Sequence, residues 1–148
     1  MRKPHQILAF PFIEENGEYF FAIFCRSGKD IWQGIAGGVE EEDKTYLEAC
    51  KREATEEAGI TNFDNVIELE SICTMPVPNV TKEMLWGEDV LLIYEHCFGI
   101  GCKTKEITLS HEHSSVEWLS YEEAKKRLKW DSNKNALWEL NYRLTNNL

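Results

Sequence analysis

The alternation of apolar and polar residues along the chain predicts a series of short strands. Runs rich in β-branched, aromatic and other apolar residues, bounded by turn residues, are typical of β-strands. The predicted strands are residues 5–13, 18–26, 66–78, 90–100 and 115–119, and a further short apolar segment, 30–38, ends in a pair of glycines. Asn16-Gly17 joins the first two strands and favours a tight hairpin turn, because both residues tolerate positive φ angles.

Three segments are predicted to be helices. Residues 45–58 carry apolar side chains at near-helical spacing, and Gly59 is suited to end this helix. Residues 120–128 begin with a serine N-cap and a glutamate three positions later, a capping box, and the last predicted helix is 133–144. Strands on both sides of the first helix, with two helices at the end, predict an α+β fold in which helices cover both faces of a mixed β-sheet. No repeat or linker interrupts residues 1–148, so a single domain is expected.

The composition is that of a globular protein with an acidic surface. The 148 residues suffice for one domain with a real core, and the formal net charge is −10. This charge argues against binding to a nucleic acid polymer or an anionic membrane. The chain opens without the apolar stretch of a secretory signal, which favours a cytoplasmic protein. An odd number of cysteines in apolar stretches favours reduced, mostly buried thiols over a disulfide framework: Cys25, Cys50, Cys73, Cys97 and Cys102.

The predicted helix 45–58 concentrates acidic residues on one face. Glu53, Glu56 and Glu57 fall within an arc of roughly 100°, because successive helical residues are rotated by about 100°. Carboxylates this close raise one another's pKa and cost stability, and a divalent cation would remove the conflict. Hard Mg²⁺ prefers carboxylate oxygens together with water and substrate phosphates. Taken alone, however, an acidic helix face is more often simply a solvated surface.

The surroundings of these glutamates form a longer pattern. A glycine at 38 and the stretch from Arg52 to Ile60, Arg-Glu-Ala-Thr-Glu-Glu-Ala-Gly-Ile, match the spacing G-x5-E-x7-R-E-U-x-E-E-x-G-U, in which U is apolar. This is the box of the Nudix (MutT-like) hydrolases, and the chain resembles that family over its whole length. The resemblance implies the family's α/β/α sandwich around a mixed sheet. One fixed position departs from the box, because Lys44 stands where the family has glutamate.

The resemblance also implies a set of site residues. Mg²⁺, with Mn²⁺ as a possible substitute, would be bound by Glu53, Glu56, Glu57 and the carbonyl of Gly37. Arg52 would orient the carboxylates through charge-assisted hydrogen bonds. Glu112, in a loop outside the box, is the candidate for a further metal ligand or general base; the alternative is an ordinary exposed loop glutamate. The catalytic candidates are thus Arg52, Glu53, Glu56 and Glu112.

The lysine at position 44 should disturb the box. In the family, the glutamate at this position helps to hold the box arginine, whereas Lys44 carries the same charge as Arg52. Glu41, Glu42 or Asp43 could supply the missing carboxylate from the same loop. A perturbed but working site is expected, and a weakened enzyme is the alternative.

Several side chains outside the box are further candidates. Trp32 could pack in the core or stack on a base, and Arg26 could meet the phosphates of a substrate. His111 and His113 could form half of a zinc site, but no third soft ligand is evident nearby. The aromatic residues near the end are expected to form an apolar packing stripe rather than a base-stacking platform: Trp130, Trp138 and Tyr142.

Three segments resemble a subgroup, the bacterial dATP and dihydroneopterin-triphosphate pyrophosphohydrolases: Trp32-Gln33, Glu112-His113 and Trp130-Asp131-Ser132-Asn133. This resemblance implies release of pyrophosphate from a (deoxy)nucleoside or pterin triphosphate. The sequence leaves open whether the protein is a monomer or a homodimer. Hydrolysis of ADP-ribose, a dinucleoside polyphosphate or a nucleotide sugar is the second alternative. Pro76 and Pro78 leave ADP-ribose open, because its hydrolases often carry a proline some residues after the box. A non-catalytic, nucleotide-sensing Nudix module is the third alternative, and Lys44 alone favours it.

Overall fold

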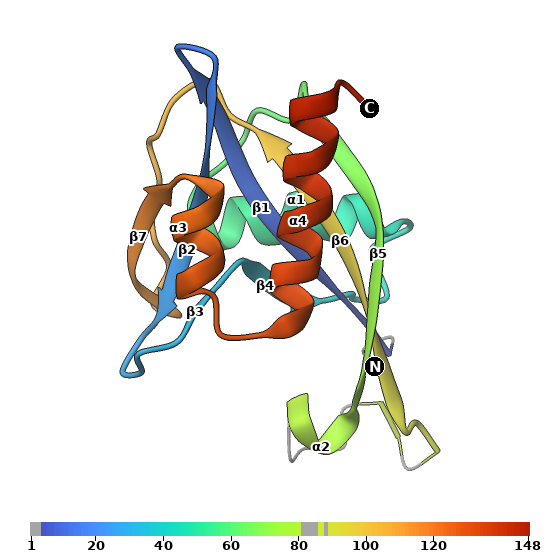
Figure 1. Cartoon of the computed structure of the whole chain (residues 1–148). Helices are drawn as coiled ribbons and strands as arrows, with labels where there is room; N and C mark the ends of the chain where they lie inside the picture. The colour runs from blue at the N-terminus through green and yellow to red at the C-terminus, as the bar shows by residue number, and fades with distance from the viewer. Residues whose placement is uncertain (1–3, 81–85, 88) are drawn as a thin grey trace.

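A computed structural model describes residues 4–80, 86–87 and 89–148 (Figure 1). The elements follow the order β1 (His5–Glu15), β2 (Glu18–Arg26), β3 (Trp32–Gln33), β4 (Ile35–Gly38), α1 (Tyr46–Ala58), β5 (Val66–Pro76), α2 (Val77–Val80), β6 (Leu92–Gly101), β7 (His113–Leu119), α3 (Tyr121–Arg127) and α4 (Asp131–Asn146). The strands form one sheet in the order β3-β2-β1-β6-β5, with β4 paired to β1 and β7 paired to β2.

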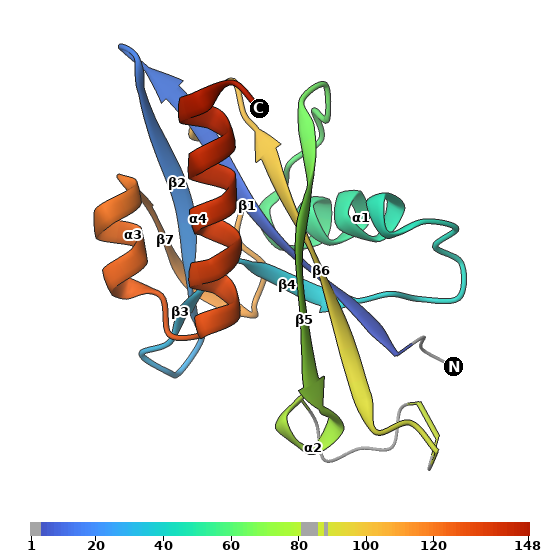
Figure 2. The same ribbon diagram turned by 45° about the vertical axis from the view of Figure 1, so that its right-hand side comes forward.

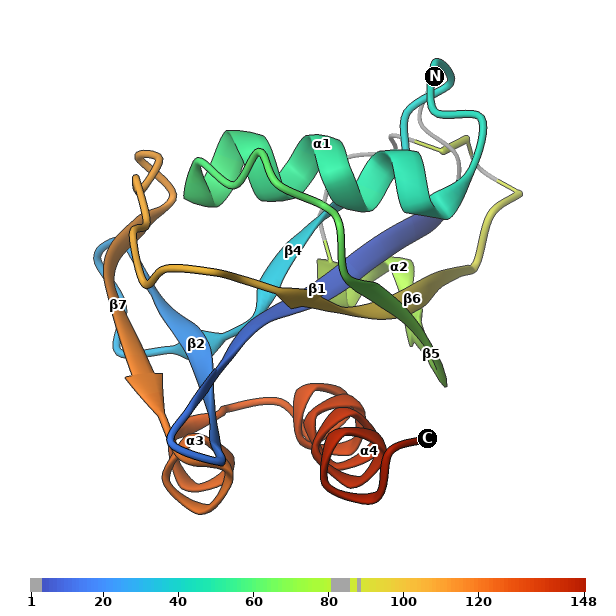
Figure 3. The same cartoon turned by 90° about the horizontal axis from the view of Figure 1, so that it is seen from above.

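Helices cover both faces of this sheet, so the expected α/β/α sandwich is confirmed. Figure 3 shows α1 on one side of the strands, and α3 and α4 on the other. The two faces have separate cores because side chains alternate along each strand. Ile7 and Ala9 of β1 pack with Ala54 under α1, whereas Leu8 and Phe10 pack under α3 and α4. All five of these side chains are fully buried.

Strand β1 is the centre of the sheet. It pairs antiparallel with β2 and β4, and parallel with β6, so the sheet is mixed as predicted. Gln6 is the register partner of Gly38 in β4 and also of Glu95 in β6. These three residues therefore form one rung across three neighbouring strands, which connects the box region to β6.

The predicted local signals are confirmed at the first hairpin and at helix α1. Asn16 and Gly17 have φ angles of 53° and 81°, as the tight turn requires. Helix α1 begins after Thr45, whose side chain accepts a hydrogen bond from the N–H of Glu48, and it ends at Gly59 in the left-handed conformation, with φ of 69°. The helix that carries the acidic face is thus fixed at both ends by its own sequence.

The predicted boundaries shift where proline and glycine occur. The strand expected for 66–78 ends at Pro76 and gives way to the single helical turn α2, which lies at the far end of β5 in Figure 2. The short segment 30–38 divides into β3 and β4 at Gly34, whose N–H donates to Asn133 Oδ1 at 2.8 Å instead of to a strand.

The predicted aromatic packing stripe near the end of the chain is wrong. Trp130, Trp138 and Tyr142 are 43%, 54% and 46% exposed, and the rings of Trp138 and Tyr142 stack on each other with centroids 5.2 Å apart. Helix α4 instead buries aliphatic side chains, among them Leu137 and Leu140, against the sheet. The aromatic residues lie on a side of the helix that the sheet does not reach.

The expected state of the cysteines is confirmed. All five are free, and three of them, Cys25, Cys50 and Cys97, are buried. Among the helices in the described part of the chain, none has the length and apolar character needed to cross a membrane.

Candidate active site

Helix α1 presents its acidic face to β4 and to the loop that precedes β7. Glu53 and Glu57, one turn apart, lie on the side that packs on the rest of the molecule and are 7% and 5% exposed. Glu56 lies at the outer edge of the same face, with its side chain 55% exposed. Two of the three carboxylates are therefore withdrawn from water, which is costly unless other groups compensate their charge.

Gly37 of β4 makes room for the carboxyl group of Glu53. A Cβ atom at position 37 would overlap the carboxyl carbon and both carboxyl oxygens of Glu53. The φ angle of Gly37 lies outside the left-handed region, so the glycine is required for space and not for backbone conformation. The Glu53 carboxyl group thus lies directly against the backbone of β4, the strand that contains Gly37, whose carbonyl the family resemblance implies as a metal ligand.

Arg52 joins the parts of the site. Its Nη2 donates to Asp43 Oδ2 and to the carbonyl of Gly38, both at 2.8 Å, and its Nε donates to Asp43 Oδ1 at 3.2 Å. Its Nη1 donates to Glu53 Oε1 at 2.9 Å and to Glu56 Oε2 at 3.5 Å. The hydrogen bond to Asp43 is the main reason why the pKa of Arg52 is raised. One guanidinium therefore fixes the box loop, the end of β4 and two helical carboxylates.

Asp43 supplies the carboxylate that Lys44 cannot. Asp43 is 6% exposed and holds Arg52 through two hydrogen bonds, so the expectation that a neighbouring acid takes over is confirmed for this residue. Its Oδ2 also accepts from the N–H of Glu40 at 2.8 Å, which folds the loop around it. Lys44 is exposed, and its backbone N–H donates to Glu48 Oε2 at 2.7 Å. The departure from the box is thus compensated one residue earlier.

The environment of Glu53 favours its protonated form more than water does. Burial raises the pKa of Glu53 to about 7, Arg52 opposes this rise, and the charges of Glu56 and Glu57 add to it. The folded protein therefore holds a proton on this carboxyl group at pH values where a glutamate in water has lost it. A cation bound beside it would favour the charged form.

The loop before β7 holds Glu57. Ser110 Oγ donates to Glu57 Oε2 at 2.6 Å, and His113 Nδ1 lies 3.5 Å from the same oxygen. His113 is 4% exposed, and burial lowers the pKa of its imidazole, so the ring is neutral near pH 7. Among the residues that the structure describes, Nδ1 has no hydrogen-bond partner. Nothing in the sequence indicated Ser110 at the site. His113 was a candidate as half of a zinc pair and as part of the Glu112-His113 segment of the subgroup resemblance.

Arg26 and Glu112 lie on either side of His113. The register of β2 and β7 shifts between Cys25 and Arg26, and this bulge places Arg26 opposite His113. Burial is the largest influence on the pKa of His113 and lowers it. The charge of Glu112 raises this pKa, and the charge of Arg26 lowers it further. The Glu112 side chain is exposed and, within the described residues, makes no hydrogen bond to the helical glutamates. The roles of Arg26 and Glu112 in binding and catalysis stay predictions.

Trp32 lies on the other face of the sheet, away from the α1 carboxylates. Its half-buried ring packs against the core under α3 and α4, and the guanidinium of Arg127 lies 5.1 Å from the ring centroid. Of the two alternatives for Trp32, these contacts favour packing.

Two of the three segments of the subgroup resemblance meet between β3 and the start of α4. Trp130 Nε1 donates to Gln33 Oε1 at 3.2 Å, and the buried side chain of Asn133 accepts from the N–H of Gly34. These contacts join two segments that lie about 100 residues apart. The paired motifs thus hold β3 and β4 against the last helix.

The donor atoms of the α1 face fit a hard divalent cation. Carboxylate oxygens of Glu53, Glu56 and Glu57 share one helix face, next to a strand that Gly37 keeps bare. In the described ranges, no three His, Cys, Asp or Glu side chains converge as a ready metal site. Arg52 engages Glu53 and Ser110 engages Glu57, so these side chains would have to turn to bind a cation together.

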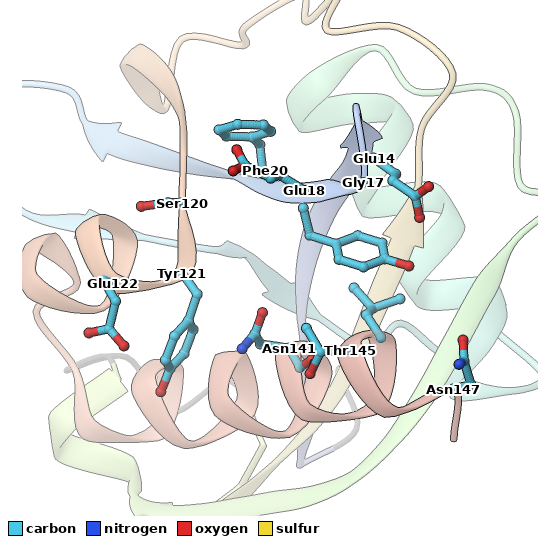
Figure 4. A pocket seen from close by; sticks show the side chains of 12 residues that line it. Glu14, Gly17, Glu18, Phe20, Ser120, Tyr121, Glu122, Asn141, Thr145 and Asn147 are labelled. Atoms are coloured by element: carbon cyan, nitrogen blue, oxygen red, sulfur yellow. The ribbon is translucent and has the colours of Figure 1, made fainter.

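Two cavities bear on where a substrate could bind. One, of about 580 Å³, lies beside the box loop and is lined in part by Asp43 and Lys44. The other, of about 710 Å³, lies between the β1–β2 hairpin and helices α3 and α4 (Figure 4). It is lined in part by Glu14, Glu18 and Glu122, and no basic side chain occurs among the residues that line it. Carboxylates repel phosphates unless a cation neutralises them. The α1 face carries Arg52 and donor atoms that fit a divalent cation, so it is the better candidate for phosphate chemistry.

Comparison with known proteins agrees with this geometry. Residues 3–139 match the family model described as the NUDIX domain. No curated protein sequence matches the chain.

Solved structures extend the likeness over nearly the whole chain. A protein of Listeria monocytogenes str. 4b F2365, assigned as a NUDIX hydrolase, is 38% identical, with a TM-score of 0.86 over 98% of this chain and 97% of that one. The dihydroneopterin triphosphate pyrophosphohydrolase of E. coli is 22% identical, with a TM-score of 0.73 over 95% and 97%. The NUDIX domain of Shewanella oneidensis NrtR, complexed with ADP ribose, is 14% identical, with a TM-score of 0.70 over 95% and 87%. At these two lower identities the likeness concerns the fold alone.

Proposed function

The chain belongs to the NUDIX domain family and is a pyrophosphohydrolase, and we propose that its substrate is a (deoxy)nucleoside or pterin triphosphate. Hydrolysis would release pyrophosphate and leave the monophosphate. Divalent metal serves Nudix hydrolases generally, and Mg²⁺ is the proposed ion here, with Mn²⁺ as a substitute. The substrate is proposed from the subgroup segments of the sequence and from the structural likeness to the E. coli pterin enzyme.

One observation carries the proposal: the buried Glu53 carboxyl group lies against Gly37 while Glu56 and Glu57 share its helix face. We assign Glu53, Glu56, Glu57 and the Gly37 carbonyl as the groups that would hold the ion. When bound, the ion would supply positive charge to the phosphates and lower the pKa of a water molecule.

The remaining residues of the chain position the reactants. Arg52 keeps Glu53 in place, and Ser110 keeps Glu57 in place, through the hydrogen bonds described above. Arg26, opposite His113 at the end of β2, would neutralise part of the phosphate charge. Water would form the new bond to phosphorus, the bond to the leaving pyrophosphate oxygen would break, and Glu112 would accept the proton of the water.

The alternative substrates share the diphosphate and differ in what is attached to it. The NrtR domain in complex with ADP ribose has the same fold. In this chain, Pro76 closes β5 and Pro78 lies in α2, away from the α1 face. The intact glutamates and the replacement of the box glutamate by Asp43 favour an active enzyme over a nucleotide sensor.

The test is release of pyrophosphate or phosphate from a panel of compounds in the presence of Mg²⁺. The panel holds dATP, the other nucleoside triphosphates, dihydroneopterin triphosphate, ADP-ribose and diadenosine tetraphosphate. Turnover of a triphosphate is expected to require metal and to collapse in Glu57→Gln, whereas Glu122→Gln, which makes the same change on α3, should behave as wild type. Binding of a panel member without any turnover would contradict the enzyme and favour a sensor.

A further inference from the structure

Strand β6 carries a buried carboxylate, Glu95, which the diphosphate chemistry does not use. Glu95 is 3% exposed, and its Oε2 accepts a hydrogen bond from Gln6 Nε2 at 2.5 Å. Its Oε1 is also buried and, within the described part of the chain, has no hydrogen-bond partner. A buried carboxylate oxygen without a hydrogen bond costs free energy, and a ligand that donates to it would recover that cost.

The position of Glu95 relates it to the box. Glu95, Gln6 and Gly38 form one rung of the sheet, so the backbone of Glu95 lies about 10 Å from that of Gly38, two strand spacings away. The Gln6 and Glu95 side chains point to the α3/α4 face, because their neighbours Leu8 and Cys97, two residues on, belong to that core. The Glu95 carboxylate therefore lies two strands away from the box glycine Gly38, on the face of the sheet opposite to the α1 carboxylates.

The open edge of β4 connects the two faces. Among the described strands, β4 pairs only with β1, so its second edge is not covered by another strand. A substrate with its phosphates at the end of β4 would have to pass this edge to place its base beneath the sheet. On the α3/α4 face, helix α4 lies next to this edge, since the N–H of Gly34, immediately before β4, donates to Asn133 of α4.

Polar side chains and one movable methionine side chain lie around the Glu95 carboxyl group. Burial raises the pKa of Glu95, and Gln6 and Ser132, which approach its carboxyl group, oppose the rise. The sulfur of Met75 lies 3.9 Å from Gln6 Nε2. Methionine is unbranched and changes rotamer at low cost, so Met75 can move aside when a ligand enters.

We propose that Glu95, with Gln6 beside it, recognises the base of the substrate, and that this base carries two adjacent N–H donors. The inference rests on the proposed function, because it places the base of the same triphosphate. Guanine and the pterins share this edge, a ring N–H next to an amino group, and a carboxylate offers two acceptors to match it. Adenine and cytosine present one donor and one acceptor, so one of their acceptors would face a carboxylate oxygen.

The substitution Glu95→Gln tests this pairing. An amide presents one acceptor and one donor, which matches adenine and not guanine. The ratio of kcat/KM for dGTP to that for dATP is expected to fall by about 100-fold or more in Glu95→Gln, because a site left with a mismatched buried group discriminates strongly. Dihydroneopterin triphosphate in place of dGTP distinguishes a pterin from a purine substrate. Glu70→Gln, on the neighbouring strand with its side chain 91% exposed, is the matched control and should leave both ratios unchanged.

Two results would overturn the inference. One is a wild-type preference for dATP over both dGTP and dihydroneopterin triphosphate, the donor-edge substrates; the other is an equal loss of kcat/KM for all triphosphates in Glu95→Gln. If that variant does not fold, Glu95→Asp, which retracts the carboxylate by one methylene, should reduce use of the donor-edge substrates without a gain for dATP. Binding separates this inference from the proposed function. Should wild type hydrolyse no triphosphate, GMP or neopterin should still raise its Tm more than AMP does, and equal Tm shifts would refute the base site.

Discussion

Substitution of Gly37 by alanine is expected to disable the enzyme by displacing one carboxylate. The added Cβ would occupy the volume that now holds the Glu53 carboxyl group, and this group must move by about the width of a methyl group. Forced overpacking of this kind costs about 1–3 kcal/mol in the free energy of unfolding. A displacement of about 1 Å in a catalytic group lowers turnover by about 100-fold, so metal-dependent release of pyrophosphate should fall at least that far.

A double-mutant cycle with Glu53→Ala isolates the cause. Without the Glu53 carboxyl group the overlap disappears, so Gly37→Ala should cost little stability in that background, because its φ angle accepts alanine. The coupling free energy between the two positions is expected to be about 1–3 kcal/mol, measured by urea unfolding of the four proteins. Full activity in Gly37→Ala, or the same cost in both backgrounds, would refute the proposed contact between the glycine and the carboxylate.

Three further predictions concern the same site. Asp43→Asn should lower the free energy of unfolding by about 2 kcal/mol, because it weakens a charge-assisted pair, whereas Lys44→Glu should change little, since Asp43 already fills the place; equal urea-unfolding curves for the two variants would contradict this. Without divalent metal, Glu53 should make the protein less stable as pH rises from about 4.5 through 7, because the folded state keeps a proton that the unfolded state has released; Tm measured against pH should lose this slope in Glu53→Gln, and an unchanged slope would rule the effect out. Ser110→Ala should raise the Mg²⁺ concentration needed for half-maximal turnover several-fold, because Glu57 loses its 2.6 Å hydrogen bond, and an unaltered metal titration would count against this positioning role.

Local signals in the sequence predict much of the fold. The hairpin at Asn16-Gly17 and the limits of α1 at Thr45 and Gly59 follow from single residues with specific backbone preferences. The box spacing likewise predicts which glutamates share one helix face, because that depends only on helical geometry. Each of these features depends on residues that are close together in the sequence, so a short segment is enough to predict it.

Features that depend on distant contacts could not be predicted in the same way. Ser110 reaches Glu57 across 53 positions, and the bulge after Cys25 decides that Arg26 meets His113. The exposure of Trp138 depends on how far the sheet extends under α4, which periodicity does not reveal. Asp43 is an intermediate case, because its loop position was evident and its choice over its neighbours was not.

The central place of β1 also sets the order in which the protein can be completed. β1 is made before the other described strands, and β2 and β4 follow it closely along the chain. Its parallel partner β6 begins only at Leu92. Until β6 has left the ribosome, one edge of an apolar strand keeps its backbone groups unpaired, which invites pairing with other chains. Because this pairing joins residues as far apart as His5 and Tyr94, it closes slowly. A nascent chain that stalls before β6 should therefore depend on chaperones, whereas one that stalls after β6 has emerged already has a closed centre to its sheet.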